Sequence, residues 1–209
     1  GAAATTAVVA AGAAVEAAAS AAEVSAVAGS AAAARREAGE MNRFARLFRH
    51  LVETRWSMRR RFSSDVLDRI EAAVRAAERT HRAEIRIVIE TDLDAWSILA
   101  GRPPRDRALE VFASCGVWDT EENNGVLLYV LFADRDVEIV ADRGYTGRVD
   151  AHEWETVCRA MEQEFRAARW CEGVIAGVEA ASALAARHYP AREGGRDDRN
   201  ELSDRPALL

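Results

Sequence analysis

The sequence contains no lysine, few cysteines and no long apolar run. Because lysine is absent, all 28 cationic side chains of the 209 residues are arginines, and the net charge is −6. A negative chain argues against a general nucleic-acid binder. The cysteines are odd in number and lack the spacing of a metal site, so we expect reduced cysteines packed in helices rather than a disulfide framework. They are Cys115, Cys158 and Cys171.

The first 40 residues form a low-complexity, alanine-rich extension. Alanine accounts for 19 of residues 1–34. The segment lacks the basic start and leucine-rich centre of a signal peptide, and Glu16 and Glu23 interrupt it where a membrane span would be apolar. We therefore predict a frayed helix or disorder over residues 1–40, and a cytoplasmic protein.

A basic amphipathic helix is predicted for residues 41–58. Residues 41–61 contain seven arginines and one acidic residue, Glu53, and so have a net charge of +6, whereas residues 62–209 have a net charge of −10. Such a helix can dock on its own acidic domain or bind an anionic membrane surface. The tether to the domain favours docking, since it raises the effective concentration. The apolar stripe expected to be covered consists of Phe44, Leu47, Phe48 and Leu51.

Residues 59–190 are predicted to form one α/β domain, followed by a disordered polar tail over residues 191–209. A strand–helix–strand crossover predicts that the first two strands are parallel, and a tight turn predicts that the third is antiparallel to the second. The second strand, GVLLYVLF, is apolar throughout and must be covered on both faces. The fold expected is therefore a three-layer α/β sandwich with a small mixed sheet and helices on both faces. The expected strands are 84–90, 125–132 and 137–141, and the expected helices are 64–79, 105–115, 150–169 and one following Gly173.

Short motifs follow one another in a distinctive order along this domain. The strand E-I-R-I-V-I precedes the helix A-L-E-V-F, and then come N-N-G-V-L-L-Y-V-L, V-E-I-V-A-D-R-G and E-G-V-I-A-G-V. This order resembles the TPM domain family, in its short soluble bacterial subgroup, over nearly all of residues 59–190. The resemblance implies an α/β sandwich. Plant members of the family are associated with acid phosphatase activity in the thylakoid lumen and with photosystem repair, and other members are accessory subunits or bind divalent cations.

Two functions from different classes are compatible with this resemblance. One is an accessory module that binds a protein partner and a divalent cation, and the alternative is a metal-dependent phosphomonoester hydrolase of the acid-phosphatase type. The chain has no nucleophile-elbow serine, no phosphate loop and no dinucleotide glycine pattern. Better-known members carry an Asp-containing motif where this chain reads RRRFSS over residues 59–64. The sequence leaves the substrate, the partner and the oligomeric state open.

Polar residues precede the second strand and follow the third. If these strands form a hairpin, residues 119–124 lie beside residues 142–144. Carboxylate and amide oxygens at one rim suit a hard cation such as Ca²⁺ or Mg²⁺. The alternative is that Asn-Asn-Gly is an ordinary turn and that the aspartate following the third strand only caps a loop. The candidate ligands are Asp119, Glu121, Asn124 and Asp142.

A second acidic group is expected at the opposite end of the same strands. Ligands of α/β sheets favour the carboxyl ends of parallel strands, which meet at this rim. The alternative is that the acidic residues of the hairpin simply suit a tight turn. This secondary acidic rim consists of Asp92, Asp94, Asp134 and Asp136.

Overall fold

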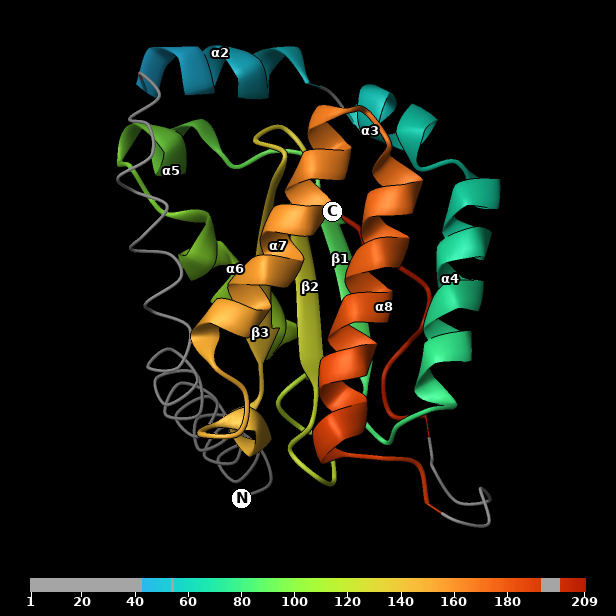
Figure 1. Ribbon diagram of the computed structural model, residues 1–209. Helices are drawn as coiled ribbons and strands as arrows, with labels where there is room; N and C mark the ends of the chain where they lie inside the picture. Colours follow the sequence, from blue (N-terminus) through green and yellow to red (C-terminus); the bar gives the residue numbers. More distant parts are fainter. Residues whose placement is uncertain (1–42, 54, 193–199) are drawn as a thin grey trace, which may run out of the picture.

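The computed structural model describes residues 43–53, 55–192 and 200–209. The predicted alanine-rich extension, residues 1–40, lies outside the described residues. A single four-stranded mixed sheet runs through the centre of the described chain (Figure 1). In the order of the sheet its strands are β3 (Asp136–Ala141), β2 (Val126–Leu131), β1 (Ile85–Glu90) and β4 (Ala207–Leu208).

Strand pairing confirms the predicted topology of the first three strands. Strands β1 and β2 are parallel, with Ile85 opposite Val126, because the helical crossover between them returns the chain to the same end of the sheet. Strands β2 and β3 are antiparallel, with Val126 opposite Ala141. This register places the start of β2 beside the end of β3, as the predicted hairpin requires.

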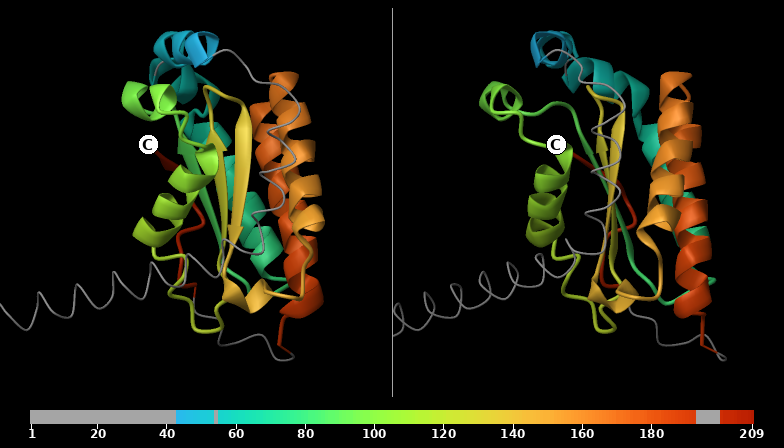
Figure 2. Two further views of the ribbon diagram at one scale, coloured as in Figure 1. Left: turned by 90° about the vertical axis from the view of Figure 1, so that its left-hand side faces the viewer. Right: turned by 60° about the vertical axis from the view of Figure 1, so that its left-hand side comes forward.

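Helices cover both faces of the sheet and thus make three layers (Figure 2). Long helices lie on one face of the sheet and shorter ones on the other, while a third group of helices lies across one end (Figure 1). The first group is α4 (Ser64–Glu78), α7 (Ala151–Arg166) and α8 (Trp170–His188); the second is α5 (Ala95–Leu99) and α6 (Pro104–Ser114); the third is α2 (Arg43–Val52) and α3 (Arg55–Arg61). No helix in the described part of the chain is long and apolar enough to cross a bilayer.

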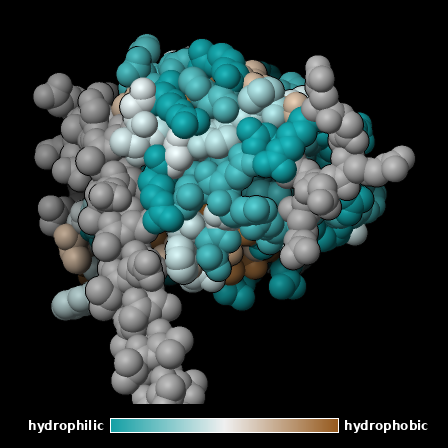
Figure 3. All heavy atoms as spheres, turned by 90° about the horizontal axis from the view of Figure 1, so that it is seen from below, coloured by the Kyte–Doolittle hydropathy of each residue, from teal (hydrophilic) through white to brown (hydrophobic). Residues whose placement is uncertain are grey.

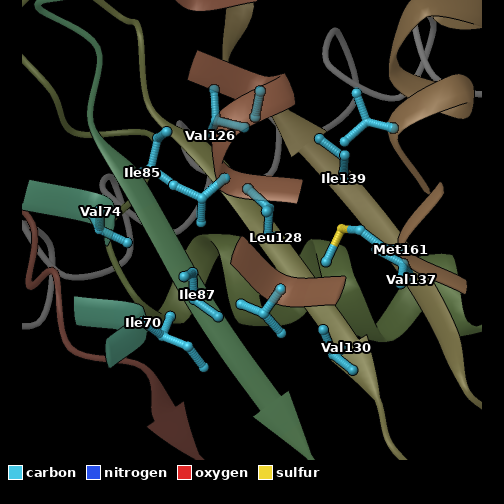
Figure 4. Close-up of a cluster of buried hydrophobic side chains, with 14 of the residues drawn as sticks. Ile70, Val74, Ile85, Ile87, Val126, Leu128, Val130, Val137, Ile139 and Met161 are labelled. Carbon is cyan, nitrogen blue, oxygen red and sulfur yellow. The ribbon is translucent and has the colours of Figure 1, made fainter. Parts of the chain in front are cut away.

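Strand β2 is buried along its whole length. Leu128 is part of the larger core with α4, α7 and α8 (Figure 4), and Tyr129 is part of the smaller core with α5 and α6. The two faces of the strand therefore belong to two separate cores, as the continuous apolar run predicts. The larger core takes Val126, Leu128, Val130 and Phe132, and the smaller one takes Leu127, Tyr129 and Leu131.

Three helical predictions are wrong in detail. The predicted helix over residues 41–58 is divided into α2 and α3, and the predicted loop over residues 91–104 contains α5, which Asp94 caps through a bond from Ser97 N. Helix α8 begins at Trp170 rather than after Gly173. A glycine suggested a break there. However, a β-carbon on Gly173 would lie 2.6 Å from the Phe165 ring, so this glycine permits close packing of α8 on α7.

The predicted disorder of residues 191–209 is wrong for residues 200–209. Strand β4 pairs in parallel with β1, and Leu209 N donates to Ile89 O at 2.9 Å. Charged residues fix this segment: Arg205 Nη1 lies 2.6 Å from an Asp68 oxygen, and Asp204 pairs with Arg75. The charged residues that led to the prediction of disorder therefore form ion pairs with α4, and the segment covers the edge of the sheet.

Helix α2 is docked on the hairpin between β2 and β3. Arg46 Nε donates to Asp134 Oδ2 at 2.8 Å, and buried His50 places Nε2 3.1 Å from Asp134 Oδ1. Burial alone would raise the pKa of Asp134, but contacts with His50 and Arg46 outweigh it and lower that pKa below its usual value. Docking of the basic helix on an acidic group of its own domain is confirmed. The predicted covering of Phe48 is wrong, because its side chain is 69% exposed.

The double-sided burial of β2 predicts a large effect of truncation at Leu128. The substitution Leu128→Ala leaves a cavity between β2 and the long helices, so we expect a loss of about 2–5 kcal/mol in the free energy of unfolding. Denaturant titration measures this loss. Leu99→Ala is the matched control, since Leu99 is an exposed side chain, and it should change the free energy by less than about 0.5 kcal/mol. Equal effects of both substitutions would contradict the assignment of β2 as the central strand.

Candidate functional site

The strongest candidate site lies where β2 begins and β3 ends, at the lower end of the sheet in Figure 1. We define the β2–β3 rim as residues 119–125 and 142–145. Asp142 N donates to Gly125 O at 2.9 Å and Gly144 N donates to Asn123 O at 3.0 Å, so backbone bonds extend the hairpin into the rim. Viewed from this end, the molecule presents mostly hydrophilic residues (Figure 3).

The side chain of Asn124 is fixed by a hydrogen bond from its amide nitrogen, whereas its amide oxygen has no donor among the described residues. Its side chain is 2% exposed, and its Nδ2 donates to the backbone oxygen of Arg82 at 2.6 Å. Its backbone N donates to Thr120 Oγ1 at 3.0 Å. Because the donor end of the amide is used, the amide orientation is fixed. The remaining oxygen, Asn124 Oδ1, is buried and has no hydrogen-bond partner in the structure.

Asp142 presents a similar oxygen. Its Oδ1 accepts from Arg143 N at 2.6 Å, an arrangement that caps the 3₁₀ turn η1 (Arg143–Tyr145). Its side chain is 1% exposed, and Oδ2 has no hydrogen-bond partner. Burial raises the pKa of Asp142 above its usual value, and the bond from Arg143 N and the charge of Arg143 offset only part of that rise. A buried carboxylate oxygen without a donor favours either protonation or a cation.

Two glycines allow the chain segments of the rim to approach one another. A β-carbon on Gly125 would lie 2.1 Å from Val117 O, and one on Gly144 would lie 2.4 Å from Asn123 O. Neither distance can be tolerated, so the glycines are required by packing. Asn123 has a φ of 54°, a left-handed conformation that asparagine accepts more readily than most residues. The Asn-Asn-Gly turn is therefore present, and it also delivers Asn124 to the rim.

The four predicted ligands do not share one environment. Asn124 and Asp142 are buried, whereas Asp119 and Glu121 are exposed. The neighbouring Glu122 forms ion pairs with Arg82 and with Arg192. In the described ranges, no group of three or more His, Cys, Asp or Glu side chains is arranged to hold a metal ion. A cation at this rim would thus depend on Asp142, on amide oxygen and on backbone carbonyls.

The comparisons with known proteins agree with this architecture. The family model described as the TPM domain matches residues 59–184. The chain belongs to the TPM domain family. The solution structure of protein BA42 from the psychrophilic bacterium Bizionia argentinensis is similar at a TM-score of 0.58, with 27% identity over 70% of this chain and 94% of that protein.

A second solved structure is more distant. The N-terminal domain of a protein from P. gingivalis matches with a TM-score of 0.46 and 21% identity, over 58% of this chain and 76% of that one. The search of curated proteins found no match. Family membership shows which fold the TPM domain has, but activity must be argued from the site itself.

The opposite rim of this TPM domain, residues 91–94 and 132–136, is engaged in structural contacts. Asp134 binds Arg46 and lies against His50, and Asp94 caps α5. Asp92 is exposed, and Asp136 is half-buried within β3. The structure therefore places the four predicted acidic residues at one end of the sheet, where two of them hold helices.

A small cavity of about 280 Å³ lies beside this opposite rim, between the end of β1 and helices α5 and α6. Its polar side chains bond to one another or to neighbours. Arg107 binds Glu90 with Nε and Nη2 both at 2.9 Å, and Tyr129 donates to Glu90 at 2.6 Å. Arg102 is paired with Glu110. These mutual contacts satisfy the charges without a ligand, so the β2–β3 rim is the better candidate.

The predicted rim included Thr120, in segment 119–124, but not Tyr145, and it assigned neither residue a role. Thr120 accepts from Asn124 N, and the hydroxyl of buried Tyr145 donates to Asn124 O at 3.2 Å. Both bonds fix Asn124 rather than offering a further acceptor. The position of Tyr145, directly after Asp-Arg-Gly, was the available signal, because a residue following the hairpin must turn back over the rim.

The raised pKa of Asp142 predicts a stabilising substitution. A carboxylate whose pKa is raised in the folded state stabilises the protein at low pH and loses that contribution as the pH rises through the folded pKa. In Asp142→Asn the side-chain oxygen still accepts the bond from Arg143 N, and the variant has no carboxylate whose stabilising contribution is lost as the pH rises. We expect the variant to unfold at higher denaturant than the parent at pH 8 in the presence of a chelator.

The pH series provides the control for this prediction. Because the pKa of Asp142 is raised in the folded state, lowering the pH protonates the carboxyl in the parent, and the advantage of Asp142→Asn should shrink as the pH falls from 8 towards 4. Denaturant midpoints measured from pH 4 to pH 8 test both ends. A constant difference across that range would show that Asp142 is not a strained carboxylate.

Proposed function

We propose that this TPM domain is an accessory module that binds a divalent cation at the β2–β3 rim and recognises a protein partner there. One observation carries the proposal. Asp142 Oδ2 and Asn124 Oδ1 are buried acceptors without hydrogen-bond partners, and the hairpin brings both to the same rim. Two such acceptors at one rim call for either ordered water or a cation.

The chemistry of these oxygens favours Ca²⁺ or Mg²⁺. Both ions are hard and take carboxylate, amide and carbonyl oxygens, and both retain water in part of their coordination shell. One carboxylate, together with amide and carbonyl oxygens and water, is enough for a weak site of this kind, so the proposal does not need the imidazole or thiolate ligands that transition metals favour in proteins. When bound, the cation would supply positive charge beside Asp142 and remove the cost of burying that carboxylate.

A protein partner fits the surroundings of the buried pair. Asp119, Glu121 and Arg143 are exposed around it. Asn124 attaches loop 119–124 to the domain through the backbone oxygen of Arg82, and Thr120 closes the loop on itself by accepting from Asn124 N. A cation held by Asn124 would fix this loop and thereby the surface that a partner contacts. Cation binding and partner binding are expected to be coupled reciprocally. A partner that prefers the ordered loop would therefore also raise the affinity of the rim for the cation.

The alternative, a phosphomonoester hydrolase, needs more than a cation. A second group must activate water or stabilise the leaving group. Among the described residues of the rim, Glu122 is paired with Arg82 and Arg192, and Asp119 and Glu121 are exposed to solvent. We therefore propose binding rather than hydrolysis, and an assay on a generic phosphate ester is the direct comparison.

Thermal unfolding with and without Ca²⁺ or Mg²⁺ tests cation binding. A cation present at 100 times its dissociation constant stabilises the folded state by about 2.7 kcal/mol. We expect stabilisation of the parent and loss of this stabilisation in Asp142→Asn. Because the raised pKa of Asp142 makes protons compete with the cation, the stabilisation by the cation should weaken as the pH is lowered towards the pKa of Asp142.

Asp119→Asn is the matched control for this titration. It removes the same charge from the same rim, but at an exposed position, so general attraction of cations falls equally in both variants. Retained stabilisation in Asp119→Asn together with its loss in Asp142→Asn supports ligation by the buried carboxylate. Equal stabilisation of the parent and Asp142→Asn would show that Asp142 is not a ligand of the cation.

A further inference from the structure

Exposed apolar side chains gather at the end of the molecule farthest from the β2–β3 rim. Within the described residues, five of the six exposed large apolar side chains belong to α2, α3 and α5. Trp56 is 69% exposed and Trp96 is 80% exposed. Helices α2, α3 and α5 lie together across this end (Figures 1 and 2), and α2 packs against α5. The five residues, which we call the aromatic end, are Phe48, Val52, Trp56, Trp96 and Leu99.

The aromatic end is surrounded by arginine. Residues 43–61 contain seven arginines and one acidic residue, a net charge of +6 in a chain whose net charge is −6. Arg46 is engaged with Asp134, but Arg59, Arg60 and Arg61 are exposed. Arg60 Cζ lies 5.4 Å from the centre of the Trp56 ring, so cation and aromatic ring are presented as one unit. Tryptophan flanked by arginine on a short helix is typical of the boundary between lipid headgroups and acyl chains.

We propose that the aromatic end binds an anionic membrane surface peripherally. Charge complementarity selects this occupant over a second copy of the chain, because a symmetric dimer through this end would bring two arginine-rich surfaces together. The apolar side chains favour a membrane over nucleic acid. Phe48, Val52 and Leu99 add aliphatic and aromatic area that suits a lipid headgroup layer rather than a phosphate backbone.

Helix α2 can be docked on its own domain and contact a membrane at the same time. Arg46 and His50 hold α2 against the hairpin, and this contact directs Phe48 and Val52 outwards. Two exposed carboxylates, Asp92 and Asp94, lie at this same end beside α5, so the arginines of α2 and α3 must outweigh them, whereas acidic residues more than about 8 Å away are screened at physiological ionic strength. With the aromatic end on a membrane, the β2–β3 rim at the other end of the sheet would face away from it (Figure 1).

Sedimentation of the full chain with vesicles tests the proposal. Neutral phosphatidylcholine vesicles are compared with vesicles that also contain phosphatidylglycerol, at low and high salt. We expect binding to the anionic vesicles that salt weakens. Each arginine near an anionic surface contributes roughly a fivefold factor in affinity, so replacing Arg59, Arg60 and Arg61 by Gln should weaken binding on the order of 100-fold.

Matched variants separate this end from the rest of the surface. The control triple, Arg79, Arg148 and Arg192 to Gln, removes the same charge from exposed positions elsewhere and should stay within about threefold of the parent. The pair Trp56→Ser and Trp96→Ser should weaken binding at least about tenfold, and circular dichroism checks that the exposed substitutions leave the fold intact. Asp142→Asn should bind vesicles as the parent does, so this test is independent of the proposed cation site.

Three results would overturn the proposal. They are no sedimentation of the parent with anionic vesicles at low salt, equal binding to neutral and anionic vesicles, and equal losses in the control triple and the Arg59–Arg61 triple. A parent that is dimeric in solution, and that becomes monomeric when Trp56 and Trp96 are replaced, would assign the aromatic end to a second copy of the chain instead.

Discussion

Burial of β2 on both faces is the constraint on which the rest of the fold depends. An apolar strand cannot lie at the edge or the surface of a sheet, so it needs a strand on each side and a helical layer above and below. Strands β1 and β3 are the neighbouring strands, and the two groups of helices are the layers on the two faces. Strand β4 then covers the outer side of β1. The three-layer sandwich follows from one six-residue segment.

The candidate site is a consequence of the same constraint. Because β3 must return beside β2, Asp142 comes to lie next to Gly125, and the chain there is packed too closely for a β-carbon at Gly125 or Gly144. Close packing excludes solvent from Asp142 and Asn124. The two oxygens are thus buried by the backbone geometry of the hairpin, and the same geometry leaves them without donors.

Periodic segments could be predicted from the sequence, and segments fixed by single distant contacts could not. The alternation of apolar residues in β1 and the continuous apolar run of β2 indicate directly which side chains are buried. The order and pairing of the strands can be inferred from that burial. Strand β4 depends on Arg205 reaching Asp68 and on a bond from Leu209 N, and no local pattern reveals either. Likewise the hairpin indicated the rim, but the burial of Asn124 rather than Asp119 depends on Thr120 and Arg82.

The proposed cation site at the β2–β3 rim is a product of the hairpin between β2 and β3. An NMR titration of the ¹⁵N-labelled full chain with Ca²⁺ tests it most directly, because backbone amides of both segments report separately. Saturable shifts concentrated at residues 123–125 and 142–145, and absent in Asp142→Asn, are the predicted result. Shifts concentrated at residues 91–94 and 132–136, or no saturable shifts at all, would contradict the account.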